Sequence, residues 1–280
     1  MQLPAQLVPT SFSLATVLAW GTSDFLGGYA TRRANAFLLT MVSHAAGLLW
    51  MLTLALASHG QFPSQHAMAW AIAGGASGGM ALALFYRALA TGRMGLTAPV
   101  AAVVGAAIPT IFGMMTEGLP GAVRIAGFLL AAIGIWLISR TEDHSSPEGI
   151  GLAALSGLGF AGFYLCMREA GQGFPLWIAS FSRASALVVT LVVVLLERKF
   201  REITRASAIL GMIAGCLDVS GTALFVRASQ TGRLDAAVVL TSLYPAVTVL
   251  LARIVLKEHF TRWKAVGMFA ALLAVPMIAG

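Results

Sequence analysis

Charged side chains are scarce in this chain. Of its 280 residues only 10% are Asp, Glu, Lys or Arg, whereas 58% are hydrophobic. The mean hydropathy is +0.85, and the core of a soluble protein of this length does not require so much apolar surface. Most of the sequence divides instead into apolar stretches long enough to cross a lipid bilayer. The shortage of charge therefore excludes a soluble domain and predicts an integral membrane protein.

Cysteines and catalytic motifs are equally sparse. The two cysteines, Cys166 and Cys216, fall in apolar stretches without metal-ligand spacing around them, so packing is their expected role and no metal site is expected. The chain has no HExxH zinc motif, no P-loop and no paired catalytic-aspartate motif. These absences exclude an intramembrane enzyme and an ATP-driven pump made of this chain alone. No cofactor is expected, although protons could be coupled to transport.

The basic residues are not gathered in one block. The net charge is +7, but Lys and Arg are scattered between apolar stretches. A nucleic-acid surface would need a clustered basic patch, so no nucleic-acid partner is expected. Membrane lipids and a small-molecule substrate are the expected partners, and the chain is expected to be a monomer or a homodimer.

Hydropathy divides the chain into about ten apolar stretches, five on each side of the polar segment "RTEDHSSPEG". Backbone groups in hydrocarbon must be satisfied internally, so each stretch is predicted to be a helix. The expected domains are a first repeat at 1–140, a linker at 141–148 and a second repeat at 149–280. The stretches are 11–30, 37–58, 67–91, 95–116, 122–139, 149–170, 175–196, 206–230, 234–256 and 262–279.

One phrase occurs twice, half a chain apart. "ALFYRALATGR" at Ala83–Arg93 returns as "ALFVRASQTGR" at Ala223–Arg233. This duplication indicates two related halves, and an odd number of membrane crossings in each half requires the second half to enter the membrane inverted. Inverted repeats around a central cavity are typical of transporters that work by alternating access. The arginines of the phrase lie near helix ends, where long basic side chains are expected to reach the membrane interface.

Orientation follows from the Lys and Arg count, because cytoplasmic loops carry the excess. The loops after the even-numbered stretches hold only Arg124, Arg168 and Arg233, and most other basic residues follow the odd-numbered stretches. The count predicts that both termini lie outside the cytoplasm.

Two ionisable residues lie inside the first two stretches. Asp24 is part of "AWGTSDFLGGY", and His44 has a similar depth in the second stretch. A charge at the centre of a span costs roughly 2.5–3.5 kcal/mol on insertion scales, so such residues need a reason. The two side chains could meet across a short hairpin and hold a proton for coupling, or form a hydrogen-bonded pair that fixes two helices. Asp24 is the candidate coupling or substrate-contacting carboxylate.

Two more ionisable residues lie at membrane depth in the second half. Asp218 stands where the first half has Gly78, and Arg183 lies nearly where the first half has His44. Arg183 could pair with Asp218 as an interhelical salt bridge or receive a substrate carboxylate through bidentate hydrogen bonds. Divergence at equivalent positions is what an asymmetric binding site on a symmetric scaffold requires. Drift to a satisfied polar residue is the alternative for Asp218.

Small and aromatic residues complete the candidate site. "AGGASGGM" around Gly78 gives a small face on which another helix can approach closely or beside which a cavity can form. Prolines such as Pro245 allow kinks in the fourth and ninth stretches. Several aromatic side chains could line a cavity, or simply pack: Trp20, Tyr86, Phe163, Tyr164 and Tyr244.

These motifs together resemble the EamA branch of the drug/metabolite transporter superfamily. The resemblance covers nearly the whole chain. It rests on "WGTSDFLGG", on "ALFYRALATG" and on two similar segments, Met114–Ile138 and Ala252–Ile278. Each of these segments has a glutamate, Glu117 or Glu258, followed by a predicted helix with a glycine near its start. It implies an all-α integral membrane fold of ten helices, arranged as two inverted five-helix repeats around a central cavity. It also suggests cytoplasmic termini, contrary to the charge count. Where members of the family often have an arginine in the second span, this chain has His44.

The resemblance implies transport of a small metabolite such as an amino acid, by proton or gradient coupling. We expect export across the inner cell membrane by alternating access. A lipid flippase or an exporter of hydrophobic drugs or cations on the same fold is the alternative, because such a ligand needs only a cavity and one or two charges. A membrane scaffold without transport would not account for the internal symmetry or for Asp24.

Overall fold

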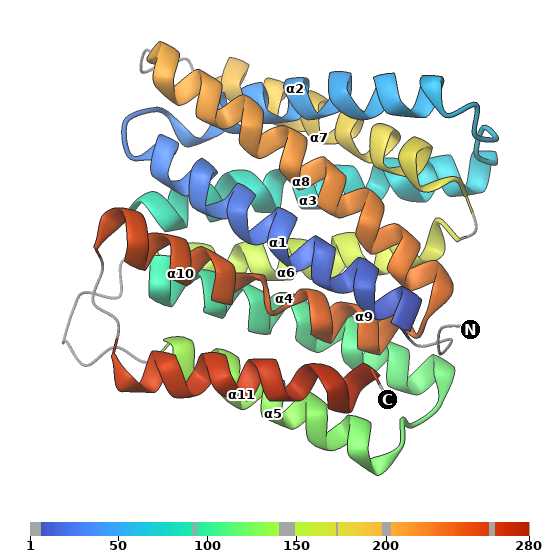
Figure 1. The fold of residues 1–280 in the computed structure, drawn as a ribbon. Coiled ribbons are helices and arrows are strands. Elements are labelled where there is room, and N and C mark those ends of the chain that lie inside the picture. Colours follow the sequence, from blue (N-terminus) through green and yellow to red (C-terminus); the bar gives the residue numbers. More distant parts are fainter. Residues whose placement is uncertain are drawn as a thin grey trace.

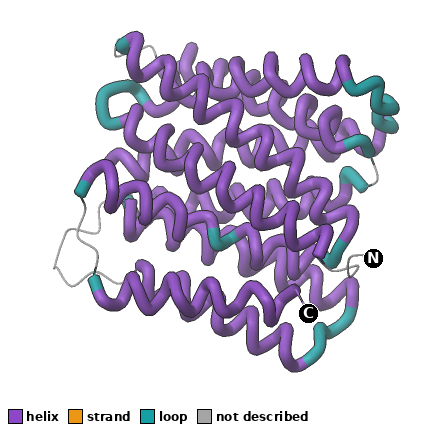
Figure 2. Tube along the Cα trace, in the orientation of Figure 1, coloured by secondary structure: helices purple, strands orange, loops and turns teal. Residues whose placement is uncertain are grey.

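The computed structural model describes residues 7–91, 94–139, 149–171, 173–197, 203–257 and 261–279, and within these ranges the regular structure is entirely helical (Figure 2). The helices lie in layers with their axes roughly aligned (Figure 1). Their bounds are α1 Leu7–Thr31, α2 Ala36–Ala57, α3 Gln65–Thr91, α4 Met94–Glu117, α5 Ala122–Ser139, α6 Ile150–Glu169, α7 Pro175–Glu197, α8 Arg205–Thr231, α9 Leu234–Thr241, α10 Tyr244–Leu256 and α11 Arg262–Ala279.

The helices agree with the predicted apolar stretches to within a few residues at each end, with one exception. The ninth stretch, predicted as a single helix over 234–256, is divided into α9 and α10. Pro245 is the second residue of α10, and a proline there has no N–H to donate to Thr241 and its ring clashes with that carbonyl. The chain therefore turns through Ser242 and Leu243 and starts a new helix. The predicted linker at 141–148 lies outside the described residues, as do Arg93 and Glu258.

The helices suit a membrane by length and composition. Seven segments of the described chain are long and apolar enough to span a bilayer: α2, α3, most of α4, α6, α7, α8, and α9 together with α10. α5 contains a shorter apolar segment, Ala122–Ile138, and α1 includes Asp24 and several Ser, Thr and Gly residues that lower its hydropathy. Large apolar side chains are exposed on the outer surface, as lipid contact requires, for example Leu18, Leu129 and Leu196. The chain is a multi-pass membrane protein.

The packing of the helices repeats when the two halves are exchanged. α1 packs along α8 as α6 packs along α3, and α2 contacts α8 as α7 contacts α3. The pairs α2–α7 and α5–α11 join corresponding helices of the two halves, and α5 and α11 form the outermost layer in Figure 1. The start of α1 and the end of α11 lie at the same end of the bundle (Figure 1). The duplication seen in the sequence is therefore also a duplication of contacts.

Four glycines allow backbones of the two halves to touch. A Cβ atom on Gly75 of α3 would collide with the carbonyl oxygen of Ser182 in α7, and a Cβ atom on Gly215 of α8 would collide with that of Ser43 in α2. In the outer layer a Cβ atom on Gly134 would lie 2.8 Å from the Gly267 carbonyl oxygen, and the converse distance is 2.6 Å. These helix crossings require glycine because any side chain would push the backbones apart.

Gly215→Ala is expected to destabilise the protein by about 1–3 kcal/mol or more, because the added methyl group overpacks a contact between two backbones. Gly151→Ala is the matched control, since a Cβ atom there meets no atom within 4 Å. Thermal unfolding of the purified variants in detergent measures the difference. Equal melting temperatures for the two variants would contradict the requirement for glycine at 215.

Candidate functional site

A cavity of about 50 Å³ lies between the two halves. Helices α1, α3, α6, α7 and α8 and the first residue of α10 contribute to its walls. This volume holds roughly three to five water molecules at ~10–15 Å³ each, so a larger ligand requires the helices or side chains to move. The lining residues are Trp20, Asp24, Gly75, Gly78, Gly79, Leu82, Phe160, Phe163, Tyr164, Ser182, Arg183, Ala186, Asp218, Thr222 and Tyr244.

Arg183 is the centre of a buried polar network on one side of this cavity. Its guanidinium forms a salt bridge to the Asp218 carboxylate and donates a longer hydrogen bond of 3.4 Å to the Thr222 hydroxyl. Its Nη1 atom lies 2.8 Å from Nδ1 of His44. Of the two alternatives raised for Arg183, the salt bridge is the one present in this structure.

His44 is neutral in this geometry. An arginine has only donors, so Nδ1 of His44 must accept the hydrogen bond from Arg183, and the ring proton is then on Nε2. The predicted pair of His44 with Asp24 is therefore wrong. Within the described residues no hydrogen bond or ion pair joins them, because His44 faces α7 rather than α1. His44 binds the Arg183 guanidinium and is not itself one of the residues that line the cavity.

Asp24 lies on the cavity wall without a counter-charge. Its side chain is buried, with an exposed fraction of 4%, and it makes no hydrogen bond or ion pair with any residue in the part of the chain that the structure describes. The nearby Asp218 carboxylate repels it. A buried ionised carboxylate in such surroundings is costly unless a positive charge or a proton compensates it. Of the described charged residues that line the cavity, Asp24 is the one without an ion pair.

Aromatic rings form much of the remaining wall. Trp20 lies 6.0 Å from Tyr164, 6.3 Å from Phe163 and 6.4 Å from Tyr244, measured between ring centroids. The indole N–H of Trp20 donates to the backbone carbonyl of Asp218 at 3.0 Å, which fixes the ring. The buried hydroxyl of Tyr244 has no hydrogen-bond partner in the described structure. Tyr244 thus offers a free polar atom at the cavity.

Two other candidate residues differ in their relation to the cavity. Tyr86 is fully buried but is not a lining residue: its ring packs against Gly27, and its hydroxyl lies 3.3 Å from the Ser23 hydroxyl. It packs against α1 instead of facing the cavity. Gly78 does line the cavity, where a Cβ atom would lie 3.0 Å from the Phe163 ring.

The break in the ninth span also lies at the cavity. Tyr244, the lining residue from this segment, is the first residue of α10. Non-helical backbone at membrane depth occurs where it is buried in protein or faces a cavity, and broken helices are common at transporter binding sites. The break is therefore a further feature that this cavity shares with the binding sites of transporters.

Five lining residues were not expected from the sequence: Leu82, Phe160, Ser182, Ala186 and Thr222. Thr222 follows Asp218 by one helical turn, so a search for polar residues on the same helix face could have found it. Phe160 has the same relation to Tyr164. Ser182 precedes Arg183 and faces the cavity because its backbone touches Gly75, which only the packing of α3 and α7 determines.

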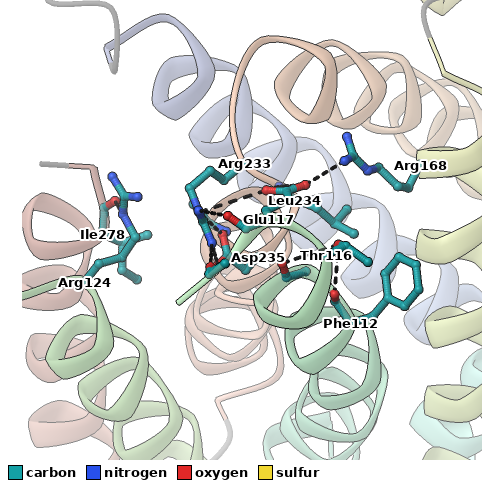
Figure 3. Close-up of polar contacts among 12 residues, drawn as sticks. Phe112, Thr116, Glu117, Arg124, Arg168, Arg233, Leu234, Asp235 and Ile278 are labelled. Carbon is teal, nitrogen blue, oxygen red and sulfur yellow. Dashed lines mark hydrogen bonds and ion pairs between the residues drawn. The ribbon is translucent and has the colours of Figure 1, made fainter. Parts of the chain in front are cut away.

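A second polar network joins the two halves at one end of the bundle (Figure 3). Arg233, at the start of α9, donates to the backbone carbonyls of Glu117 and Gly118 at 3.0 and 2.6 Å and to both oxygens of Asp235. The Glu117 carboxylate at the end of α4 binds Arg168 of α6 at 2.9 Å and accepts from the Leu234 N–H at 3.2 Å. The network therefore fastens α4 to α6 and α9.

Arg233 takes part in a hydrogen-bond network, whereas the other described arginines of the repeated phrase are exposed. Arg87 and Arg227 are exposed, in line with the expected position at the interface. Hydrogen bonds to the Asp235 carboxylate raise the pKa of Arg233 above its ordinary value, so its charge persists at any physiological pH. Arg233 is a structural link between the halves rather than a solvated side chain.

Asp218→Asn is expected to lower the free energy of unfolding by about 3–5 kcal/mol, because it leaves the Arg183 charge buried without a counter-ion. The double variant Arg183→Met/Asp218→Leu removes both charges and is expected to lose less. Thermal unfolding of the three proteins in detergent measures this. A single variant as stable as the parent would mean that the salt bridge does not hold α7 to α8.

The chain is similar to known proteins in sequence and in fold. Residues 147–280 match the family model described as the EamA-like transporter family. No curated protein matches the chain. Among solved structures, one described only as the crystal structure of a protein is similar over 96% of this chain and 95% of its own, with a TM-score of 0.76 and 17% identity. At this identity the likeness concerns the fold alone. The second half of the chain, residues 147–280, therefore belongs to the EamA-like transporter family, as the sequence motifs indicated.

Proposed function

We propose that this protein is a secondary-active transporter that exports a small metabolite with an amino group, an amino acid or a related compound, by alternating access. The observation that carries the proposal is the central cavity between the halves, with the unpaired carboxylate of Asp24 on its wall. Transport as such is what the EamA family suggests. The cavity supports it because intramembrane ionisable residues that face a cavity mark substrate or ion pathways.

Alternating access requires two halves that can rock against each other. In this proposal the chain crosses the membrane ten times as two inverted repeats, and the recurrence of contacts between the halves supports that arrangement. The Arg233 network then holds one end of the cavity closed, and its rupture opens that end. Asp24 takes up the coupled proton when no substrate is bound.

The remaining expectations fit the same proposal. The protein acts in the inner cell membrane, in contact with lipids, as a monomer or homodimer, without a cofactor and without nucleic acid. A second candidate, export of hydrophobic cations or lipids, is favoured by the aromatic wall formed by Trp20, Phe163, Tyr164 and Tyr244.

Reconstituted protein is expected to move labelled amino acids across proteoliposome membranes under an imposed pH gradient. Asp24→Asn is expected to abolish gradient-driven flux, because an amide neither releases a proton nor pairs with a cation. Glu169→Gln is the matched control, since Glu169 is an exposed acid at the end of α6. Full activity of the Asn variant would remove Asp24 from the mechanism. Absence of flux for every hydrophilic substrate, together with binding of lipids or dyes, would favour the second candidate.

Arg233→Gln is expected to open the closed end, because it removes the hydrogen bonds from the Arg233 side chain to the carbonyls of Glu117 and Gly118. The readout is the rate at which a membrane-impermeant maleimide labels Ala186→Cys in the cavity, in a background where Cys166 and Cys216 are serine. A several-fold rise is expected. Arg227→Gln serves as the control, because Arg227 is an exposed arginine near the end of α8. A labelling rate of the Arg233→Gln variant equal to that of the parent would contradict a closing role for Arg233.

A further inference from the structure

We propose that the central cavity is a site for organic ammonium ions, with Asp24 as the counter-charge, so that the amino group and not the carboxylate of a substrate is what the protein recognises. This inference rests on the proposed transport function and narrows its substrate class. A simple amine is then a better ligand than a carboxylate of the same shape.

The charges around the cavity favour a cation. The charged lining residues are Asp24, Arg183 and Asp218. Arg183 and Asp218 neutralise each other in a salt bridge, and His44, which accepts from Arg183, is neutral. When Asp24 is ionised, the lining thus has one negative charge in excess, and it belongs to Asp24. Complementary charge at a desolvated site decides which ligand can enter.

Anion recognition by Arg183 is disfavoured by its bonds. Both terminal nitrogens of the guanidinium already donate, to Asp218, His44 and Thr222, and its buried Nε–H is the one donor without a partner in the described structure. A substrate carboxylate would have to displace Asp218, whose buried charge would then lack its partner. It would also lie close to Asp24, which repels it. The arrangement therefore penalises a carboxylate and accommodates an ammonium ion.

The aromatic residues add attraction of the same sign. Trp20, Phe163, Tyr164 and Tyr244 line the cavity together with Asp24, and Trp20 lies within 6.4 Å of each of the other three rings. Faces of aromatic rings attract cations and repel anions, and the effect increases when the cation is desolvated. The unpartnered Tyr244 hydroxyl can accept a hydrogen bond from an ammonium N–H. A carboxylate beside aromatic rings is a chemical match for an ammonium head.

Size also favours recognition of a head group. The cavity of about 50 Å³ accommodates a small ammonium group, whereas a longer apolar body requires the aromatic rings to move. The rings are apolar surfaces on which that body can then pack. We therefore expect amines with an apolar or aromatic body to bind better than methylammonium.

Three probes test the inference because they share one aromatic body: 2-phenylethylammonium has only the amino group, phenylalanine has both groups, and 3-phenylpropionate has only the carboxylate. Calorimetric titration of the purified protein is expected to give the tightest binding for the amine and at least tenfold weaker binding for the propionate. If 3-phenylpropionate bound as tightly as 2-phenylethylammonium, the inference would be overturned. A lack of binding by all three probes would also overturn it.

Variants connect this preference to Asp24. Asp24→Asn is expected to weaken binding of 2-phenylethylammonium at least tenfold, whereas the control Glu169→Gln is expected to bind like the parent. Asp24→Glu retains the charge and is expected to bind 2-phenylethylammonium more tightly than Asp24→Asn does. This comparison distinguishes binding lost with the negative charge from binding lost through misfolding. Unchanged amine binding by the Asn variant would overturn the inference.

Flux measurements separate this inference from the proposed function. Proteoliposomes that transport phenylalanine but are neither inhibited by nor permeable to 2-phenylethylammonium would overturn the ammonium site and leave the transporter standing. Conversely, amine binding that depends on Asp24 without flux of any probe would support the site and contradict transport. Flux of both amine and phenylalanine, with none for the propionate, is the expected result.

Discussion

The buried guanidinium of Arg183 is the group around which the centre of this protein is arranged. A cation at membrane depth must be paired within the protein, and Arg183 meets this requirement with Asp218 of α8 on one side and His44 of α2 on the other. Helices from both halves are thereby held in one register. Because Asp218 is paired with Arg183, Asp24 is the carboxylate on the cavity wall that has no ion pair in the described structure.

Duplication with divergence accounts for this arrangement. Ser43 and Ser182, which precede His44 and Arg183, touch Gly215 and Gly75 in the same way, so His44 and Arg183 occupy equivalent places in the two halves. Equivalent residues can meet where the halves adjoin, as these two do at 2.8 Å. Two arginines there would repel each other. One arginine and one neutral histidine form a donor and an acceptor, so the different residues at these equivalent places form a hydrogen bond.

Close packing and polar links have different roles in the scaffold. Glycine contacts between α3 and α7 and between α8 and α2 bring the backbones together near the cavity, where hydrocarbon provides no driving force for association. At one end of the bundle, the Arg233 network joins α4 to α6 and α9 through hydrogen bonds and an ion pair. Tight crossings at the centre and polar bonds at the periphery suit the proposed alternating access, in which the halves stay in contact while one end opens.

The sequence alone determined the helices, because length and hydropathy are local properties: the predicted stretches match the helices closely, and Pro245 already marked a weak point in the ninth. It also singled out Asp24, His44, Arg183 and Asp218, since charge at membrane depth is rare. Only the tertiary structure decided their partners. Whether His44 faces Asp24 or Arg183, and whether Tyr86 or Tyr244 reaches the cavity, depends on the rotation and crossing of helices far apart in the chain, which hydropathy does not encode.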